Sequence, residues 1–427
     1  MANITLFAQA IGRLPKECIR KIIREEKTDK HSKGYDTWSQ FISMMFCQFS
    51  GCDSVRDISN GLNSANGNLN HLGICRAPSK STVAYQNAKR DSGVFRRVFY
   101  ALLAHFGRQP IWQRDTFRFK LPFTSTVAYQ KAKRDSGVFR RIFYALLAHF
   151  GQQTIWQRTK FRFKMPIKLL DSSTITLTMS LYEWAHYTTK KGAVKMHTLL
   201  DYDSLLPEFV NITDGKCSDN RGALDIPVSP HSVVVADRGY CDFSLLDYWD
   251  SRNVFFVVRH RDNLLYSQIE ERLLPETRAQ NVLIDEIIEL TGEQTKKKYT
   301  KPLRRIAVWN DEHGYVVQLL TNNFKLAAST IAQLYKARWM IEIFFRNIKQ
   351  LLKIKNFIGT SRNAVETQIW TALSTMLLLC WLKHIAKYKW GLANLVVSLR
   401  LNTFTKIELE KWLNEPFTPP PEPAGVV

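Results

Sequence analysis

The spacing of hydrophobic positions divides the chain into a helical first part and an α/β second part. Over the first 80 residues it predicts short helices separated by polar turns, with an amphipathic helix over 38–49 and a loop over 60–70. Apolar runs without polar alternation are typical of strands buried on both faces, so we expect a mixed α/β sheet from Ile167 onward. The predicted strands cover 167–170, 175–179, 194–200, 208–212, 233–236 and 254–258, with a helix over 243–250.

The last third of the chain adds a strand-rich block and several helices. Residues 259–323 are polar and strand-rich and contain a basic cluster over 296–305. A helical period follows, for which Ser329 or Thr330 is a suitable N-cap. The apolar run over 369–382 has 14 residues, short of the roughly 18–20 that cross a bilayer, so it predicts a buried helix packed on the α/β domain. Repeated prolines after Glu415 predict a disordered tail.

Residues 81–124 and 125–168 form a direct repeat of 44 residues. Over the first 27 positions the copies differ only at Asn87/Lys131 and Val98/Ile142. Two units are too few for a stacked repeat architecture, so a segmental duplication is the better interpretation. Each copy predicts a helix ended by a glycine, Gly107 or Gly151, and then a basic strand-like run. We expect one copy to be surplus to the fold.

The charge balance indicates a polyanionic partner. The chain has 60 Lys and Arg against 38 Asp and Glu, a formal net charge of +22, with 12% aromatic residues. Residues 81–168 hold 18 of the basic residues and three acidic ones. Such a charge favours nucleic acid first and a membrane surface second. Seven cysteines without zinc-site spacing, and no apolar signal segment at the N-terminus, fit a reducing cytoplasm.

One helical stretch carries a candidate functional stripe. At the helical period, an arc of about 60° contains four polar residues: Tyr335, Arg338, Glu342 and Lys349. The opposite side of the stretch is apolar, as expected of a helix docked on a core. Cations beside a glutamate are also common on solvated helix faces, so the stripe alone does not decide its role.

Two aspartates strengthen the functional interpretation. Asp171 and Asp237 each directly follow one of the predicted buried strands. A carboxylate at the end of a buried strand is costly unless it is paired or binds a cation. The alternatives are a turn or helix cap at Asp171 and an ion pair with Arg238 at Asp237. Together with Glu342, the two aspartates form a candidate metal-binding set.

With these residues the sequence resembles the DDE transposases of bacterial insertion sequences. The resemblance is to the cut-and-paste, insertion-sequence-four-like group, whose third motif is Tyr-x2-Arg-x3-Glu-x6-Lys. The stripe meets this motif without a mismatch. Leu-Asp-Ser at 170–172 and Ala-Asp-Arg-Gly-Tyr at 236–240 stand where the other two motifs belong, and 191–197 and 211–216 are also similar to the group. The resemblance runs from the N-terminal segment to about residue 385.

The resemblance implies a ribonuclease H-like mixed sheet in which the strands of Asp171 and Asp237 lie side by side. A β-rich insertion over about 259–323 interrupts this sheet before the Glu342 helix. The N-terminal module resembles one that grips the terminal repeats of the element, with a plain helical cap as an equal alternative. We expect four regions: a helical module over 1–80, the duplicated basic segment over 81–166, the catalytic domain over 167–385, and a helical C-terminal region with its tail over 386–427.

The resemblance also implies the catalytic chemistry. Asp171, Asp237 and Glu342 would be the catalytic residues and would hold two Mg²⁺ ions, for which Mn²⁺ could substitute. Carboxylates are the natural ligands of such ions, and two of them stabilise charge on the attacking and leaving oxygens of a phosphodiester. Asp171 would bridge the ions, and the other two carboxylates would each complete one.

Several residues are candidates for contact with DNA. The resemblance assigns to the backbone near the cleaved end the other members of the stripe, Tyr335, Arg338 and Lys349. Lys195 and His197 alternate on one strand face and are further candidates, with an exposed strand edge as the alternative. Relatives that form a hairpin intermediate stack a flipped base on an aromatic residue of the insertion. Trp309 is the only Trp there, and the strand pattern around it favours a core position.

The implied function is metal-dependent cleavage of DNA at insertion-sequence ends, followed by transfer of the 3′-hydroxyl strand into target DNA. The partners would be double-stranded DNA, as terminal inverted repeats and target, and a second copy of the chain in a synaptic homodimer, with no membrane. The protein would be cytoplasmic and nucleoid-associated in a bacterium. A ribonuclease H-like structure-specific nuclease is one alternative. A non-catalytic DNA-binding derivative is the other, and the duplication keeps it open although all three carboxylates are present.

Overall fold

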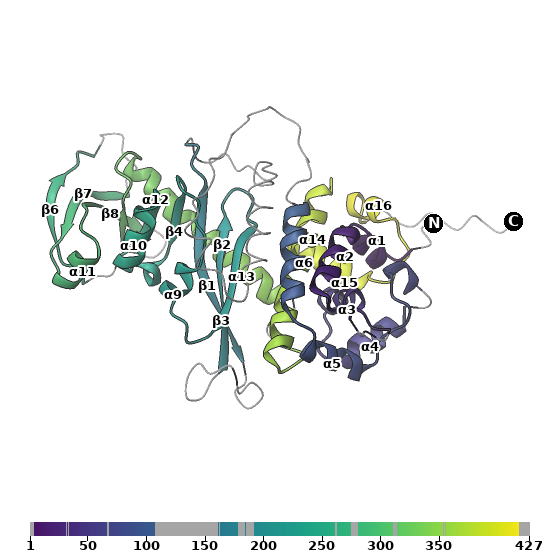
Figure 1. The fold of residues 1–427 in the computed structure, drawn as a ribbon. Coiled ribbons are helices and arrows are strands. Elements are labelled where there is room, and N and C mark those ends of the chain that lie inside the picture. Colours follow the sequence, from purple (N-terminus) through teal and green to yellow (C-terminus); the bar gives the residue numbers. More distant parts are fainter. Residues whose placement is uncertain are drawn as a thin grey trace. The chain divides into compact units, whose positions relative to one another are not determined.

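The computed structural model divides the chain into two compact units. A helical unit is formed by residues before 156 and after 346, and a sheet unit by the residues between them (Figure 1). The structure describes residues 4–30, 32, 34–65, 68–106, 161, 163–177, 184, 192–260, 263–274, 281–310, 314–352, 354 and 356–417. Most of the second repeat copy, the predicted helix stops at Gly107 and Gly151, and the tail beyond residue 417 therefore lie outside the described residues.

Short helices make up the N-terminal part of the helical unit, as the sequence predicts, and the C-terminal part adds the 24-residue helix α14. Side chains cap several of them, for example Asp36, which accepts a hydrogen bond from the backbone N–H of Ser39 at 2.8 Å. The helices are α1 (Leu6–Gly12), α2 (Lys16–Glu26), α3 (Thr37–Ser50), α4 (Val55–Asn63), α5 (Lys80–Lys89), α6 (Gly93–Phe106), α14 (Arg362–Ile385), α15 (Leu392–Leu401) and α16 (Leu409–Asn414), with a short 3₁₀ turn η1 (Asn70–Leu72).

Two details of the N-terminal prediction are wrong. The helix predicted over 38–49 is present as α3, but it has no solvent-facing side, because every residue from Thr37 to Phe49 is buried. It packs against α2, α4, α5, α14 and α15, so apolar and polar sides alike are covered. The predicted loop over 60–70 begins later, since α4 continues through Asn63. A capping box formed by Ser54 and Asp57 stabilises the first turn of that helix.

The long apolar helix α14 belongs to the helical unit. We expected it to pack on the α/β domain, within a region over 167–385, but it packs against α3, α5, α6 and α15. It is the one helix among the described residues that is long and apolar enough to cross a membrane, and nine-tenths of its apolar window is buried within the protein. The boundary between the units falls inside α13 (Trp339–Leu351) rather than at residue 385.

The first copy of the repeat is part of the helical core. It forms α5 and α6, and Phe95 and Phe99 of α6 are fully buried. On the partly exposed side of α6, Arg97 pairs with both Glu25 and Glu26 of α2 at 2.5 Å. The apolar face that we expected to be surplus in one copy is therefore covered in the first.

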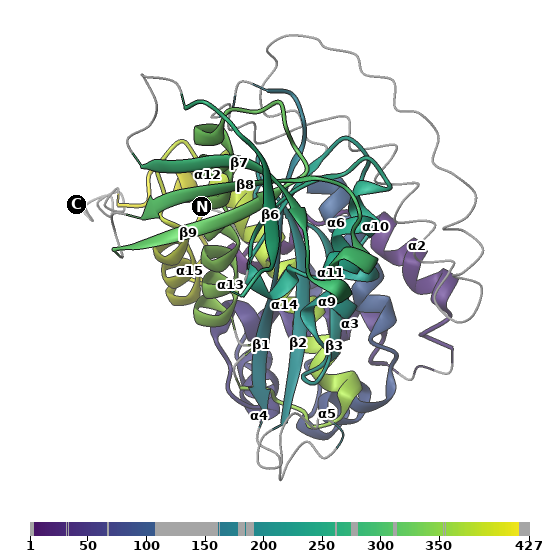
Figure 2. The ribbon, with the colours of Figure 1, turned by 90° about the vertical axis from the view of Figure 1, so that its left-hand side faces the viewer.

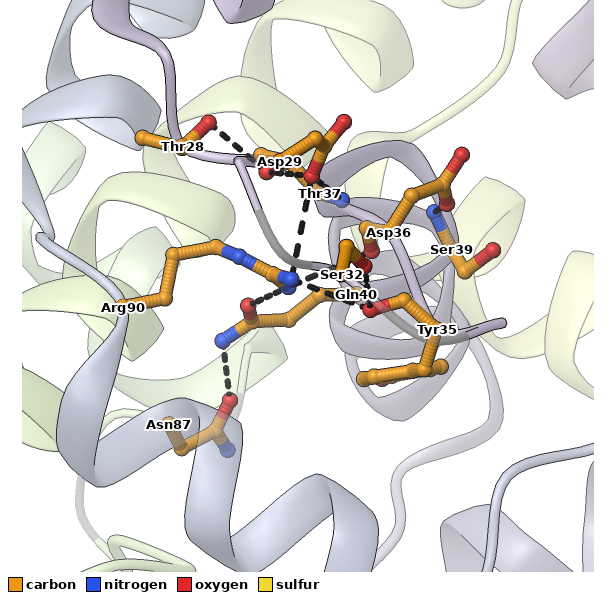
Figure 3. Close-up of polar contacts among 10 residues, drawn as sticks. All are labelled: Thr28, Asp29, Ser32, Tyr35, Asp36, Thr37, Ser39, Gln40, Asn87 and Arg90. Atoms are coloured by element: carbon orange, nitrogen blue, oxygen red, sulfur yellow. Dashed lines mark hydrogen bonds and ion pairs between the residues drawn. The ribbon is translucent and has the colours of Figure 1, made fainter.

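A buried polar network fixes α5 against α3 (Figure 3). The Gln40 amide donates to Oδ1 of Asn87 at 2.7 Å and accepts from the Arg90 guanidinium at 2.6 Å. Arg90 also donates to the Tyr35 carbonyl at 3.0 Å and lies 3.7 Å from the Asp29 carboxylate. Asn87 is only 1% exposed, so the position suits a short neutral amide. A longer charged side chain there would not reach water.

The sheet unit is built on one sheet of nine strands in the order β3-β2-β1-β4-β5-β9-β8-β7-β6. Strands β1, β4 and β5 run parallel to one another, and all other neighbours are antiparallel. The protein is thus a mixed α/β structure with helical N- and C-terminal regions. The strands are β1 (Ile167–Leu177), β2 (Gly192–Asp201), β3 (Pro207–Asp214), β4 (Val233–Ala236), β5 (Phe255–Arg259), β6 (Tyr266–Glu271), β7 (Val282–Leu290), β8 (Leu303–Asn310) and β9 (Tyr315–Thr321).

The predicted strands agree closely with the sheet, with one exception. The runs over 167–170 and 175–179 are a single long strand, β1, because antiparallel pairing with β2 continues from Lys168 through Leu177; Met179 lies outside the described residues. The block over 259–323 is strand-rich as predicted, and its four strands extend the same sheet through pairing of β9 with β5. In Figure 2, β7–β9 run at a large angle to β1–β3, as expected from accumulated twist.

Helices cover the sheet around its central strands. The helix α10 (Phe243–Asp250) packs on β5, and α9 (Asp219–Leu224) packs on β2 and α10. The helix α12 (Ala328–Ala337) contacts β4, β5, β7 and β8, and α11 (Glu293–Lys298) contacts α10. Strand β4 is buried along its whole length, which explains its unbroken apolar sequence.

A glycine allows α9 to approach β2 closely. A Cβ atom at Gly222 would lie 2.3–2.6 Å from three ring atoms of His197. That imidazole is fully buried, and its Nε2 lies 3.0 Å from Oγ1 of Thr213.

We expect Gly222→Ala to destabilise the sheet unit by about 2–3 kcal/mol, because overpacking a tight contact forces a backbone shift. Chemical denaturation followed by circular dichroism measures the change. The double variant Gly222→Ala/His197→Ala removes the clashing ring and should lose less stability than the two single variants added together. Strict additivity would show that the methyl group does not meet the imidazole.

Candidate functional site

The parallel pairing of β1 and β4 brings the two candidate aspartates together. Leu170 is opposite Ala236 in the register, and Asp171 and Asp237 are the next residues of each chain segment. Our expectation that these two strands lie side by side is confirmed. Asp171 does not end its strand, however, because β1 continues to Leu177.

Each aspartate is held by a nearby backbone N–H. Oδ1 of Asp171 accepts from the N–H of Ser172 at 2.7 Å, and Oδ1 of Asp237 accepts from the N–H of Gly239 at 2.7 Å. Asp237 thereby caps the 3₁₀ turn η2 (Arg238–Tyr240). A Cβ atom at Gly239 would lie 2.9 Å from Oδ1 of Asp237, so any larger residue here would push against the Asp237 carboxylate.

The stripe is carried by two helical segments rather than one. Tyr335 lies on α12, Arg338 is the C-cap of α12, and Glu342 and Lys349 lie on α13. At the junction the N–H of Arg338 donates to the carbonyl of Tyr335, and the N–H of Ile341 to that of Arg338, both with three-residue spacing. The predicted N-caps are also wrong, since α12 begins at Ala328 after Ala327.

Arg338 lies between two of the candidate carboxylates. One guanidinium nitrogen is 3.4 Å from Oδ2 of Asp171, and another is 2.6 Å from Oε1 of Glu342. The Asp171 and Arg338 side chains are about one-sixth exposed and that of Glu342 is one-third exposed. The structure therefore connects β1 with the first turn of α13 through a single cation.

The environment of Asp171 disfavours its charge. Burial raises the pKa of its carboxyl from 3.8 to about 7, with the negative charges of Asp237 and Glu342 adding to the effect. Arg338 opposes this rise. A carboxylate surrounded in this way is stabilised by positive charge, and hard oxygen ligands suit divalent cations.

The three carboxylates are not arranged as a closed coordination shell. Among the described residues, no group of three or more His, Cys, Asp and Glu side chains converges closely enough to hold a metal ion as they stand. The donor chemistry fits a divalent cation, and the Arg338 guanidinium lies between two of the donors. Binding of a cation between Asp171 and Glu342 would require that guanidinium to give up at least one of its two contacts.

The other residues of the stripe have different surroundings. The Arg338 guanidinium lies 5.8 Å from the centre of the Tyr335 ring, and burial raises the pKa of that phenol. Lys349 is half-buried on the last turn of α13. On the apolar side of α13, Ile341 and Ile348 are fully buried, as the helical pattern predicts.

Lys195 and His197 share one face of β2, and this strand is not the exposed edge that we gave as the alternative to DNA contact. Strand β2 lies between β1 and β3, so it is not an edge, and α9 covers this face. Nζ of Lys195 donates to the carbonyl of Cys217 at 2.8 Å and lies 3.2 Å from Asp219. Burial lowers the pKa of His197 to about 4, so it is neutral and inaccessible to DNA.

Sequence reasoning missed Asp219, the first residue of α9. Its Oδ1 accepts a hydrogen bond from the Ser172 hydroxyl at 2.6 Å, directly beside Asp171. The sequence contains little indication of a functional role, because Asp219 follows Ser218 and such polar pairs are common at helix starts, where they only cap the helix. Only the packing of α9 on β2 brings this carboxylate to the candidate site.

The strand-rich block also differs from expectation in its side chains. Trp309 is 40% exposed, not in the core: Val308 takes the buried position, and Trp309, on the opposite face, is paired with the exposed Val316. The basic cluster is divided. Arg304 forms a buried two-pronged pair with Asp285 at 2.7 Å, so it is structural, whereas the lysines of α11 are exposed.

Two protein-family models match this chain. The model of the transposase DDE domain family matches residues 162–379, which include Asp171, Asp237 and Glu342. A domain of unknown function (DUF4372) matches residues 2–75, the N-terminal part of the helical unit. This second match lies within the helical module that we expected over 1–80, which stays a prediction.

Similar proteins are known from several bacteria. A Sinorhizobium fredii protein named as a transposase (y4zB) is 33% identical over 50% of this chain and 60% of its own length. The named transposase of insertion sequence element IS5377 from Geobacillus stearothermophilus is 31% identical over 51% of this chain and 56% of its own. The chain thus spans somewhat over half the length of these relatives.

A solved structure also shows limited likeness. The piggyBac transposase synaptic complex with hairpin DNA aligns over 97% of this chain and 81% of that one, with 11% identity and a TM-score of 0.40. That score is too low to establish a common fold. The family match covers half of the chain and all three candidate carboxylates, and the chain belongs to the transposase DDE domain family.

Proposed function

We propose that the protein is an insertion-sequence transposase that cleaves DNA at the ends of its element and joins the freed 3′-hydroxyl to target DNA. Membership of the DDE family supports the reaction class. The observation that carries the proposal is the pairing of β1 with β4, which sets Asp171 beside Asp237, while Arg338 ties Glu342 to the same place.

We further propose that the sheet is of ribonuclease H-like type. Three antiparallel strands, a helix, and two strands parallel to the first follow one another from β1 to β5, as expected for that fold. The strands β6–β9 then form the insertion before the Glu342 helix. This order supports a site at the carboxyl end of β4, beside β1.

Asp171, Asp237 and Glu342 are the residues that would hold two divalent ions, with Mg²⁺ as the natural pair and Mn²⁺ as a substitute. When bound, such ions stabilise charge on the attacking and leaving oxygens of a phosphodiester. The backbone N–H groups of Ser172 and Gly239 hold the two aspartates in place for this task. DDE transposases in general depend on divalent metal.

The basic residues of the stripe would engage the DNA backbone. The Arg338 guanidinium can donate two parallel hydrogen bonds to a phosphate once a cation takes its place between the carboxylates. The Tyr335 ring lies on one side of the same guanidinium, 5.8 Å from it, and could contact the same stretch of backbone. Lys349 would supply a point charge further along α13. We do not include the buried His197 among these contacts, and Lys195 already lies against Asp219.

The proposed partners follow from the reaction. They are double-stranded DNA, as terminal inverted repeats and as target, and a second copy of the chain in a synaptic homodimer. The N-terminal helices are the proposed end-binding module. The net charge of +22 supports a polyanionic partner, and we propose a cytoplasmic, nucleoid-associated protein.

The test is incubation of the purified chain with labelled duplexes that span the ends of its own element, with Mg²⁺ or with EDTA. We expect metal-dependent cleavage and products joined to a target plasmid. Cleavage without any joining would favour the structure-specific nuclease. Specific DNA binding with no cleavage in either Mg²⁺ or Mn²⁺ would favour the non-catalytic derivative.

We expect Lys349→Ala to weaken binding of an element end and to reduce the slope of log affinity against log salt by about one unit, because one phosphate contact is lost. Arg338→Ala should do the same and also alter the acidic site. Fluorescence anisotropy at several salt concentrations, with EDTA present, measures both. Lys325→Ala, an exposed lysine elsewhere in the sheet unit, is the control and should leave the slope unchanged. Unchanged slopes for Lys349 and Arg338 would make the stripe an ordinary helix face.

A further inference from the structure

Asp219 stands where β1, β2 and α9 meet. Its Oδ1 accepts from the Ser172 hydroxyl of β1 at 2.6 Å and lies 3.2 Å from Nζ of Lys195 on β2. Ser218 caps the helix by accepting from the N–H of Arg221, so Asp219 is not needed as the cap. Its side chain is therefore available for contacts outside α9.

The second oxygen of Asp219 faces the turn after Asp237. A Cβ atom at Gly239 would lie 3.3 Å from Oδ2 of Asp219 and 2.9 Å from Oδ1 of Asp237. The Asp219 carboxylate thus approaches both segments that carry the catalytic aspartates, at Ser172 on one side and at Gly239 on the other. Ser172 and Gly239 are also the residues whose N–H groups hold Asp171 and Asp237.

Lys195 balances the charge of this extra carboxylate. Its ammonium group is largely buried, with the side chain 13% exposed, and the Cys217 carbonyl fixes it from the other direction. A carboxylate near two others would otherwise add to their mutual repulsion. Paired in this way, Asp219 accepts the Ser172 hydrogen bond while the Lys195 ammonium group balances its charge.

We propose that Asp219 is a positioning residue, which acts through Ser172 and the Gly239 turn to fix the Asp171 and Asp237 carboxylates for metal binding. The proposal rests on the proposed function, since it assumes that these two aspartates bind the metal. Groups that orient metal ligands change metal affinity when removed, typically by about 10–100-fold, while the ligands themselves remain.

The test is the metal requirement of Asp219→Asn. We expect the Mg²⁺ concentration for half-maximal cleavage to rise about tenfold, with activity partly restored at high Mg²⁺ or by Mn²⁺. Binding of Mn²⁺ to the protein alone, followed by electron paramagnetic resonance, should weaken in parallel. Ser172→Ala removes outright the hydrogen bond that an asparagine oxygen at position 219 could still accept, and it does not unbalance Lys195. It should therefore shift the metal requirement in the same direction even if Asp219→Asn folds poorly.

A second variant separates positioning from stability. In Lys195→Met/Asp219→Asn the buried charges are removed together, so the melting temperature should recover towards that of the wild type while the raised Mg²⁺ requirement remains. Recovery of both properties together would mean that Asp219 is merely structural and would overturn the proposal. So would a wild-type Mg²⁺ requirement in both Asp219→Asn and Ser172→Ala.

Failure of the proposed function gives a different result. Asp171→Asn should be inactive at every Mg²⁺ and Mn²⁺ concentration, whatever happens at Asp219. If Asp171→Asn cleaves like the wild type, the proposed function itself is wrong. If Asp171→Asn is inactive and both Asp219→Asn and Ser172→Ala keep a wild-type metal curve, only the role of Asp219 is wrong.

Discussion

Replacing Asp171, Asp237 or Glu342 by its amide is expected to abolish cleavage at element ends while leaving DNA binding nearly intact. Each amide keeps the shape of the side chain but removes a negative donor to the proposed metal pair. Loss of one group that stabilises transition-state charge costs at least about a hundredfold in rate. Gel assays of cleavage and of binding, on the same labelled duplex, measure the two effects separately.

The matched control is Glu293→Gln, an exposed glutamate that pairs with Lys297 on α11. It should cleave like the wild type, because its contact is a solvated pair within one helix. Cleavage that persists in any one of the three acidic-site variants would remove that residue from the catalytic set. Loss of DNA binding in step with cleavage would instead indicate damage to the fold.

The Asp171→Asn variant should also be more stable than the wild type in EDTA. Because the folded protein holds the Asp171 proton up to a pKa of about 7, whereas the unfolded chain loses it near 3.8, the wild type loses stability as the pH rises between these values. The amide cannot ionise, so the gain in melting temperature should grow from pH 4 to pH 7 and then level off. Scanning calorimetry at several pH values measures it. An unchanged difference across this range would mean that Arg338 fully compensates the burial.

Shortening the chain by one repeat should leave the protein folded only if Asn87 is kept. Deleting 108–151 joins Gly107 to Gln152 and keeps the first copy through α6. Deleting 81–124 joins Lys80 to Ser125 and puts the second copy there. The two products have equal length and differ at only two positions, Asn87 against Lys131 and Val98 against Ile142.

The difference at position 87 should decide the outcome. A lysine in place of Asn87 would lose the hydrogen bond from Gln40 and bring an ammonium group near the buried Arg90 guanidinium (Figure 3). An unpaired buried charge costs roughly 3–5 kcal/mol. We expect the 108–151 deletion to melt at or above the temperature of the full chain, and the 81–124 deletion to melt lower or to aggregate.

Thermal melts and size-exclusion chromatography of both deletions test this expectation. Restoring asparagine with Lys131→Asn in the 81–124 deletion is the control and should bring back most of the lost stability. Equal melting temperatures for the two deletions would show that the site tolerates either copy. Unfolding of both would show that the duplicated segment has acquired a structural role of its own.

Local patterns predicted most elements of the sheet unit. Unbroken apolar runs identified β4 and β5, and the helical period identified α10, because burial on both faces or on one helical face leaves a direct mark on composition. The pairing of β1 with β4 also followed from the family resemblance. The join of two predicted strands into β1 did not, since the polar residues Asp171 and Ser172 interrupt the apolar run.

Packing partners were less predictable than elements. Nothing in the run over 369–382 distinguishes a core of helices from the surface of a sheet, and α14 lies in the helical unit. His197 looked available on a strand, but the glycine of α9 that covers it lies 25 positions further along the chain. Asp219 was missed for the same reason. Its proposed role depends on the packing of α9 on β2, and the spacing of hydrophobic residues along the sequence does not reveal such a contact.

The central place of β4 has a consequence for the order in which the protein opens. The strand has β1 on one side and β5 on the other, and no side chain of it reaches solvent. The outer strands β3 and β6 can fray one at a time, and β6 is largely exposed already. Amide hydrogens next to the two aspartates should therefore exchange with deuterium among the last in the sheet unit. Fraying at the sheet edges is expected to leave the spacing of the two aspartates unchanged, because neither β1 nor β4 adjoins an outer strand.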